Sequence, residues 1–288
     1  MTKVKIAVIG LSGESIFMNV DKFHKNGETK QAKSLFIEPG GKGYNQAVAC
    51  CKLGAEVSYL SSVGKDQYGK VCEDYMKNIG IHTYFKYKDE NTSVATILTD
   101  EMGENRVTVY KGASSLLDLN DLESFKDQIK KCDILLVQNE VPYDVLKEAI
   151  KFAKLNNVYI ILNPAPAVYD LKEIINEVDL LIPNEQEAYA IYNKKIEDLK
   201  CQDILNNVII TLGKDGALLI NKNIKKYFPA IKTNVVDTTG AGDVFCAAIA
   251  CKIKTNSLED AIKFAIKASS KHIEKKHVLD AIPTIKEL

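Results

Sequence analysis

The segment Asp237-Thr-Thr-Gly-Ala-Gly-Asp243 combines the residue types that phosphoryl transfer requires, directly before an apolar helical pattern. The small residues Gly240, Ala241 and Gly242 expose backbone N–H groups at the helix start, where amides and the helix dipole bind anions. The carboxylate of Asp243 can take the proton of a hydroxyl while the amides hold the transferred phosphoryl group. An aspartate that only stabilises the helix start would not need three small residues before it, so we favour the catalytic interpretation.

A second glycine-rich segment, Pro39-Gly-Gly-Lys-Gly-Tyr-Asn45, leads into another helical pattern. Gly41 lets the backbone approach a ligand closely, and the side chains of Lys42 and Asn45 can form hydrogen bonds with a polyol. A glycine-rich turn that merely begins a helix explains the segment equally well on its own.

Several polar residues follow apolar strand patterns, at the sheet edge where open α/β folds bind ligands. They are Glu140, the segment Asn163-Pro-Ala-Pro166, and Asn184 with Glu187 in Pro183-Asn-Glu-Gln-Glu187. Asn184 and Glu187 offer the oxygen atoms that Mg²⁺ and its bound waters prefer. A helix capping box is the alternative explanation of their spacing.

The common nucleotide motifs are absent from the chain. Gly10-Leu-Ser-Gly13 lacks the spacing of the dinucleotide fingerprint, and no G-x-x-x-x-G-K-[ST] or G-x-S-x-G sequence occurs. Hydride transfer on a Rossmann domain and Walker-type nucleotide binding therefore lose their main support. The segment Thr211-Leu-Gly-Lys-Asp-Gly216 is a tight turn between two strand patterns, for which a hairpin alone is a sufficient explanation.

Strand and helix patterns alternate along most of the chain. Continuously apolar runs such as 134–137 and 158–162 indicate strands covered on both faces. Their alternation with helices predicts a mostly parallel sheet between helical layers, an α/β three-layer sandwich in a single domain over residues 1–288. The expected strands are 4–9, 57–61, 134–138, 158–162, 178–182, 207–212 and 217–220, and the expected helices are about 42–53, 67–79, 143–156, 185–192, 244–253 and 258–275.

Two regions, 16–38 and 84–110, interrupt this alternation with short strands separated by Gly, Asn and Asp turns. They predict a small antiparallel sheet built from two insertions. Such a sheet can be a lid over a site, an extension of a sheet edge, or the contact surface of a homodimer.

Composition limits the function classes. The 38 basic and 38 acidic side chains balance, which argues against a nucleic-acid binder, and the longest apolar run, 244–251, is too short for a membrane helix. Arg106 is the only arginine, so backbone amides, lysines and metal must bind any phosphate. The seven cysteines mostly lie in apolar runs, and a strand pattern begins almost at once, which predicts a reduced cytoplasmic protein.

Taken together, these motifs resemble the ribokinase-like family, also called the phosphofructokinase-B carbohydrate kinases, over nearly the whole chain. The segments 40–45 and 237–243 resemble the two signatures of the family, and the second signature is highly specific. The segments 163–166 and 183–187 are most similar to ribokinases. The resemblance implies ATP-dependent phosphorylation of a sugar hydroxyl by an α/β sandwich with a β-sheet lid.

The resemblance also implies roles for individual residues. Asp243 corresponds to the general base, and the amides of Gly240, Ala241, Gly242 and Asp243 correspond to the anion hole. The substrate-binding positions correspond to Gly13, Ser15, Gly41, Lys42, Asn45 and Glu140. The positions that bind ATP and Mg²⁺ correspond to Asn184, Thr211, Gly213, Gly216 and, through water, Glu187, and those of a monovalent cation such as K⁺ to Asp237 and Thr239.

Two positions depart from the family pattern. Ser15, next to Glu14, replaces an aspartate that holds two sugar hydroxyls in ribokinases, and a hydroxyl cannot form that charge-assisted pair. The usual Lys-Gly-Ala segment near the C-terminus reads Lys276-His-Val278, so His277 replaces a glycine in a loop that contributes to the cation site of relatives.

We therefore expect an ATP-dependent kinase of ribose or a related small carbohydrate. A nucleoside, another ketose or an acid sugar is the alternative acceptor, because Ser15 departs from the ribose-binding pattern. The single arginine disfavours a sugar phosphate. A non-catalytic ligand-binding protein of the same fold is the third interpretation, against which Asp243 and the intact anion loop argue.

Overall fold

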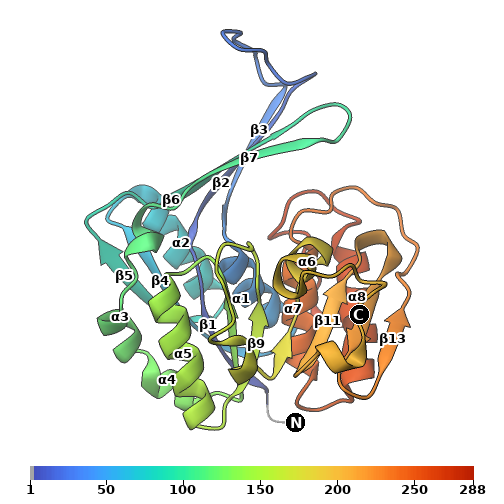
Figure 1. The fold of residues 1–288 in the computed structure, drawn as a ribbon. Helices are drawn as coiled ribbons and strands as arrows, with labels where there is room; N and C mark the ends of the chain where they lie inside the picture. Colours follow the sequence, from blue (N-terminus) through green and yellow to red (C-terminus); the bar gives the residue numbers. More distant parts are fainter. Residues whose placement is uncertain (1–2) are drawn as a thin grey trace.

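The computed structural model describes residues 3–288, and within them nine strands form one large sheet (Figure 1). The strands are β1 (Lys5–Ile9), β4 (Glu56–Gly64), β5 (His82–Lys88), β8 (Ile134–Gln138), β9 (Tyr159–Asn163), β10 (Leu180–Leu181), β11 (Asn207–Thr211), β12 (Ala217–Ile220) and β13 (Lys225–Phe228). Their order is β13-β12-β11-β10-β9-β8-β1-β4-β5. All neighbouring strands from β11 to β5 are parallel, whereas β12 is antiparallel to both of its neighbours.

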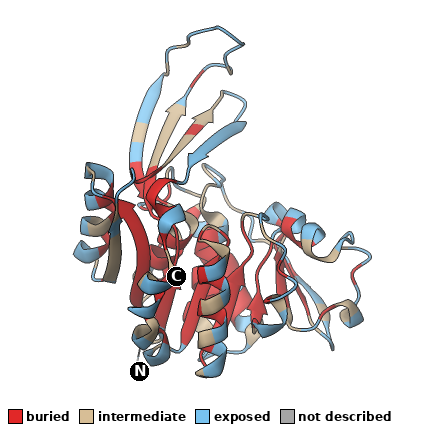
Figure 2. Cartoon of the chain, turned by 60° about the vertical axis from the view of Figure 1, so that its left-hand side comes forward, coloured by how far each residue is buried: buried red, intermediate tan, exposed pale blue. Residues whose placement is uncertain are grey.

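Helices cover both faces of the large sheet. One face carries α1 (Lys42–Lys52), α2 (Gln67–Asn78), α7 (Ala241–Lys252) and α8 (Leu258–His272), and the other carries α3 (Leu119–Glu123), α4 (Lys126–Lys131), α5 (Tyr143–Leu155) and α6 (Glu185–Tyr192). Successive side chains of a strand point to opposite faces, so Val8 packs into one core and Ile9 into the other. The sheet is therefore buried on both sides (Figure 2), as its continuously apolar strands predict.

The predicted α/β three-layer sandwich is confirmed, and each expected strand and helix has a counterpart. Two helix ends differ by three residues: α7 begins at Ala241 instead of 244, and α8 ends at His272 instead of 275. Four elements of the α/β body were not expected from the sequence: α3, α4, β5 and β13. The strands β5 and β13 lie at the two edges of the sheet, where half-exposed side chains give no continuous apolar run.

Short 3-10 helices connect some of these elements: η1 (Gly112–Leu116), η2 (Ile175–Glu177), η3 (Cys201–Asp203), η4 (Gly213–Asp215) and η5 (Ile285–Glu287). Across the described part of the chain, none of the helices has the length and apolar character that crossing a membrane requires.

A small second sheet, here called the lid, projects from the α/β body (Figure 1). It consists of β2 (Gly13–Asn19), β3 (Ser34–Gly40), β6 (Ser93–Thr99) and β7 (Asn105–Tyr110) in the order β3-β2-β6-β7. The pairs β2–β3 and β6–β7 are antiparallel, and the central pair β2–β6 is parallel. The lid strands exceed the first expected insertion, 16–38, at both ends. The second, 84–110, was placed too early, because residues 84–88 belong to β5 and pair with β4 in the large sheet.

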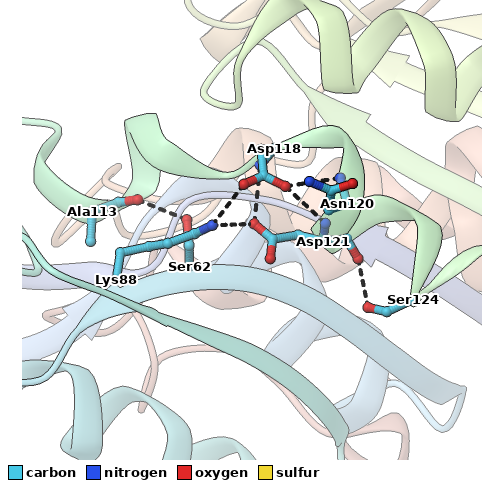
Figure 3. Close-up of polar contacts among 7 residues, drawn as sticks. All are labelled: Ser62, Lys88, Ala113, Asp118, Asn120, Asp121 and Ser124. Atoms are coloured by element: carbon cyan, nitrogen blue, oxygen red, sulfur yellow. Dashed lines mark hydrogen bonds and ion pairs between the residues drawn. The ribbon is translucent and has the colours of Figure 1, made fainter.

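Polar contacts fix the second lid insertion to the large sheet where the chain leaves and where it returns (Figure 3). Where it leaves, Lys88 at the end of β5 forms ion pairs with Asp118 and Asp121, at 3.1 and 2.6 Å, within the capping box of α3. Where it returns, the hydroxyl of Ser62 in β4 donates a hydrogen bond to the carbonyl of Ala113 at 2.8 Å. The strands β6 and β7 therefore extend from a fixed base.

Candidate active site

The anion loop lies at the N-terminus of α7, which Gly240 caps with a left-handed φ of 80°. The N–H of Ala241 donates to the carbonyl of Thr238 at 3.2 Å, so this amide, expected in the anion hole, is engaged within the protein. In the part of the chain that the structure describes, the N–H groups of Gly240, Gly242 and Asp243 have no protein acceptor. These three amides are therefore available to an anion.

Two side-chain amides from α1 hold the carboxylate of Asp243. Its Oδ2 accepts a hydrogen bond from Nδ2 of Asn45 at 3.0 Å, and its Oδ1 accepts one from Nε2 of Gln46 at 3.0 Å. Asp243 is only 7% exposed, so these donors fix the orientation of a nearly buried carboxylate. Gln46 was not among the predicted site residues, and its position beside Asn45 was the only signal for it in the sequence.

Gln46 also connects Asp243 to the ends of two strands. Its Nε2 donates to Oδ1 of Asn163 at 3.1 Å, and its Oε1 accepts from Nε2 of Gln138 at 2.6 Å. Gln46 and Gln138 are fully buried, so this network lies out of contact with water. The hydrogen bonds of this buried network restrict the orientation of Gln46 and of Asp243, although the amide oxygen of Gln138 has no partner among the described residues.

Replacing Gln46 by leucine should lower both stability and turnover. Leucine has no amide, so Asp243 loses one donor and buried polar atoms of Gln138 and Asn163 lose partners, at a cost of about 1–3 kcal/mol each. Urea unfolding and steady-state kinetics measure the two losses. The same substitution at Gln67, which is exposed at the start of α2, is the matched control and should change neither value. A Gln46→Leu variant with the wild-type unfolding free energy would contradict the network.

Three of the predicted acceptor-binding residues, Gly41, Asn45 and Ser15, lie at or beside the start of α1. Gly41 precedes α1 with a φ of 118°, and a Cβ there would overlap the carbonyl oxygen of Leu11, so the position requires glycine. The hydroxyl of Ser15 lies against Gly40, and Oδ1 of Asn45 lies 4.0 Å from the point that a Cβ on Gly40 would occupy. The Oδ1 atom of Asn45 is buried and has no partner among the described residues, so it is free to accept a hydrogen bond from a ligand hydroxyl.

Lys42, the first residue of α1, contacts Glu140. The backbone N–H of Lys42 donates to Oε2 of Glu140 at 2.7 Å. Burial works to lower the pKa of Lys42, but three neighbouring carboxylates raise it overall and keep the ammonium group charged; they belong to Asp243, Glu140 and Glu187. Burial raises the pKa of Glu140 to about 7, against the opposing effect of Lys42.

Asn184 and Glu187 form the capping box of α6. Oδ1 of Asn184 accepts from the N–H of Glu187, and Oε2 of Glu187 accepts from the N–H of Asn184, both at 2.8 Å. Both residues also border a cavity of about 120 Å³ that Lys42, Gly242 and Asp243 share. Burial raises the pKa of Glu187. Capping thus uses only Oε2 of Glu187, and its other carboxylate oxygen forms no hydrogen bond among the described residues.

The donor set at this cavity fits Mg²⁺ only together with water and phosphate oxygens. Among residues 3–288, no group of three or more His, Cys, Asp or Glu side chains is arranged to hold a metal ion. Mg²⁺ commonly keeps several waters and uses one or two carboxylates plus substrate phosphates. The residues present therefore suit a metal ion that arrives with a nucleotide.

A larger cavity, of about 630 Å³, lies beside the anion loop and has the size of a nucleotide site. Thr211, Gly213 and Gly216 line it from the turn between β11 and β12, and Gly242 lines it from α7. Side chains of α7 and α8 supply an apolar part of its wall. The hairpin turn predicted from the sequence is present, and it also faces this cavity.

Asp237 and Thr239, expected at a monovalent cation, already have protein donors. The carboxylate of Asp237 accepts from the N–H groups of Thr239 at 2.9 Å and His277 at 3.3 Å, one on each oxygen. The carbonyl oxygen of Thr239 lies 2.7 Å from Nε2 of His272. His277 has the left-handed φ, 68°, that suits the glycine expected at its position, and its ring stacks on Phe36. Each of these three oxygen atoms therefore already accepts one hydrogen bond from within the chain.

Comparison with known proteins decides the family. The chain matches the pfkB family of carbohydrate kinases over residues 3–285. It belongs to this family. It is 36% identical over 272 residues to the ribokinase of Bacillus subtilis (strain 168). This match covers 92% of this chain and 91% of the relative. It is also 31% identical over 295 residues to the deoxyribokinase of Salmonella typhi, with 98% of this chain and 96% of the relative covered.

The fold of this pfkB kinase agrees with that of solved relatives. The structure of Arabidopsis thaliana ribokinase complexed with ribose and ATP matches it with a TM-score of 0.86 at 26% identity, covering 99% of this chain and 97% of that chain. The family resemblance inferred from the motifs and the expected enzyme class are thereby confirmed: the chain is a carbohydrate kinase.

Most residues predicted for the site of this pfkB kinase lie around its cavities. Five of the predicted residues do not line these cavities: Gly13, Ser15, Gly41, Asn45 and Glu140. Gly13 is buried in β2 with its backbone packed against that of Ser93, where it contributes to the base of the lid. The roles of the individual residues stay predictions.

A further cavity, of about 540 Å³, lies between the lid and the C-terminal loop of the pfkB kinase. Phe17, Phe36 and Ile97 line it from the lid, and Thr239 and His277 line it from the opposite side. The ring centroid of His277 lies 3.5 Å from that of Phe36 and 6.4 Å from that of Phe17. A space with aromatic walls therefore adjoins the segment that leads into the anion loop.

Proposed function

We propose that this pfkB kinase transfers the γ-phosphoryl group of ATP to a hydroxyl of ribose or a related small carbohydrate. The observation that carries the proposal is the position of Asp243, which is held by Asn45 and Gln46 and lies in the first turn of α7 beside the free amides. A base for the acceptor hydroxyl and an anion site for the phosphoryl group therefore lie side by side. The ribokinase and deoxyribokinase relatives support a pentose as the acceptor.

In the proposed reaction, Asp243 takes the proton of the acceptor hydroxyl while the hydroxyl oxygen attacks the γ-phosphorus. The new P–O bond forms as the bond from the γ-phosphorus to the oxygen bridging the β-phosphate breaks, and ADP leaves. The amides of Gly240, Gly242 and Asp243 stabilise the charge on the transferred group. Glu187, with Asn184 beside it, would hold Mg²⁺ through water molecules, and the ion would neutralise phosphate charge.

The structure also favours a second candidate acceptor, a nucleoside. Ser15 can form one hydrogen bond where the resemblance implies an aspartate with two, which weakens the argument for ribose itself. The cavity between lid and C-terminal loop offers the rings of Phe17, Phe36 and His277, against which a nucleobase can stack. The ketose and acid-sugar acceptors considered from the sequence gain no comparable support.

An ADP-release assay with purified protein, ATP and Mg²⁺ tests the proposal. The acceptor panel contains ribose, 2-deoxyribose, fructose, gluconate and adenosine. The highest kcat/KM with ribose or 2-deoxyribose supports the first candidate, and the highest with adenosine supports the second. The proposal fails if no acceptor raises ADP release above the rate with ATP alone. Chelation of Mg²⁺ should abolish turnover.

The KM of the acceptor should depend on pH through Glu140. Its pKa of about 7 means that the carboxylate is anionic above this pH and becomes protonated below it. Protonation removes the charge that strengthens hydrogen bonds from acceptor hydroxyls, so KM should rise as the pH falls through the pKa and then level off. Initial rates across this range measure the effect. Glu140→Gln should raise KM and remove its pH dependence, and a wild-type KM that stays constant would count against the assignment.

The same carboxyl group should lower stability as the pH rises. Its pKa is raised from 4.5 to about 7 in the folded state, so its stabilising contribution is full below 4.5 and is lost as the pH rises through 7. Glu140→Gln removes the buried charge, and its Tm should exceed that of the wild type only at pH values above this window. Glu104→Gln, in the exposed turn of the lid, is the matched control for thermal unfolding.

We also propose that the lid contacts a second copy of the chain. Leu35 and Ile37 in β3 are 61% and 43% exposed, and their pairing places them on the same lid face as Met18 and Ile16 of β2. An apolar strip of this kind is typical of a contact surface. Light scattering should give the mass of a dimer for the wild type, and it should give the mass of a monomer for Leu35→Glu.

All seven cysteines are free, which supports the predicted cytoplasmic location.

A further inference from the structure

We infer that His272 holds the anion loop in place of a monovalent cation, and that turnover of this kinase is independent of potassium. The inference rests on the phosphoryl transfer proposed at Asp243. Thr239 directly precedes the anion loop, and its carbonyl oxygen accepts a hydrogen bond from the imidazole of His272 at 2.7 Å.

His272 lies directly against the start of the anion loop. It is the last residue of α8 and is fully buried. Its Nε2 lies 3.3 Å from the point that a Cβ on Gly240 would occupy, so the ring packs on the residue that caps α7. The ring of His272 thus lies beside the peptide that joins Thr239 to Gly240, and the carbonyl of that peptide accepts its hydrogen bond.

The protonation state of His272 suits this role. Burial lowers the pKa of the imidazole, which is therefore neutral. A carbonyl oxygen only accepts hydrogen bonds, so the one ring hydrogen is assigned to Nε2. Nδ1 is buried and forms no hydrogen bond by distance and angle among the described residues, although the backbone of Ala281 lies near the ring and opposes the lowering of its pKa. The ring thus directs the positive end of an N–H dipole at the carbonyl, as a cation would direct its charge.

The neighbouring oxygen atoms are also occupied by N–H donors. Both carboxylate oxygens of Asp237 accept backbone hydrogen bonds, from Thr239 and His277. Glu38 in β3 accepts from the backbone N–H groups of the two residues after His277, at 2.8 and 3.0 Å, and so anchors the same loop to the lid. The loop before α7 is therefore ordered by hydrogen bonds from within the chain.

Wild-type protein in potassium chloride and in tetramethylammonium chloride of equal ionic strength gives the first test. We expect the same kcat and the same Tm in both salts. Activation by potassium of severalfold, or a higher Tm in potassium, would overturn the inference. The Tm comparison does not require turnover, so it remains decisive even if no acceptor is phosphorylated and the proposed function fails.

Variants of His272 give the second test. His272→Ala should lower kcat by about tenfold, the equivalent of one lost hydrogen bond, with little change in the KM of ATP. His272→Gln, which keeps an N–H donor, should recover part of the loss. Potassium should raise both kcat and Tm of His272→Ala, because the carbonyl of Thr239 is then open to a cation. A His272→Ala variant with the wild-type kcat, or one whose kcat and Tm do not change with potassium, would contradict the inference. His82→Ala, exposed in β5, is the matched control.

Discussion

Replacing Asp243 by asparagine should lower kcat by about 10²–10⁴-fold while the KM of ATP changes little. Asparagine has nearly the same shape, but its amide cannot take the proton of the acceptor hydroxyl. It also places an NH₂ group opposite one of the two donors, Asn45 or Gln46, that now hold the carboxylate. Steady-state kinetics with saturating acceptor and ATP measure the loss.

The loss of turnover in Asp243→Asn must be separated from a loss of fold. Thermal unfolding and circular dichroism report whether the variant remains folded, and Asp198→Asn, at an exposed position, should leave both kcat and Tm unchanged. A folded Asp243→Asn variant that keeps more than a small fraction of wild-type turnover would exclude Asp243 as the base.

The parts of the site that the sequence predicted are those that are contiguous in it. The residues around Gly240 form a local motif whose backbone conformation and chemistry follow from a few neighbouring residues. Gln46 carried no such signal, because it reaches Asp243 across 197 residues of chain. His272 is similar: its ring meets Thr239 only through the packing of α8 against α7. Contacts of this kind depend on tertiary packing, which no single segment specifies.

The alternatives left open by the sequence were not mutually exclusive. Asn184 and Glu187 form a capping box and also border the cavity beside Asp243. The amide of Ala241, by contrast, forms a backbone hydrogen bond at the helix start, a detail that depends on where α7 begins. The boundary of the lid was misplaced for a related reason: β5 is an edge strand with half-exposed side chains, so its composition resembles that of the lid strands.

Gly240→Ala should lower kcat by about 10²-fold, because catalysis is sensitive to displacements of about 1 Å in the groups that contact the reacting atoms. Gly240 has a φ of 80°, and alanine in this region costs about 1–2 kcal/mol. Its Cβ would also lie 2.7 Å from Cγ1 of Val278 and 3.3 Å from Nε2 of His272. The backbone must shift to relieve these contacts, and the shift moves the amides away from the phosphoryl group.

Gly54→Ala separates the backbone strain from the displacement of the loop. Gly54 follows α1 with a φ of 96°, and a Cβ there would have no neighbour within 4 Å. Both variants should therefore lose stability in urea unfolding, with the larger loss for Gly240→Ala, but only Gly240→Ala should lose turnover. Equal kcat values for the two variants would mean that the amides of the anion loop do not stabilise the transferred group. Loss of turnover in Gly240→Ala alone would assign the effect to the position of these amides.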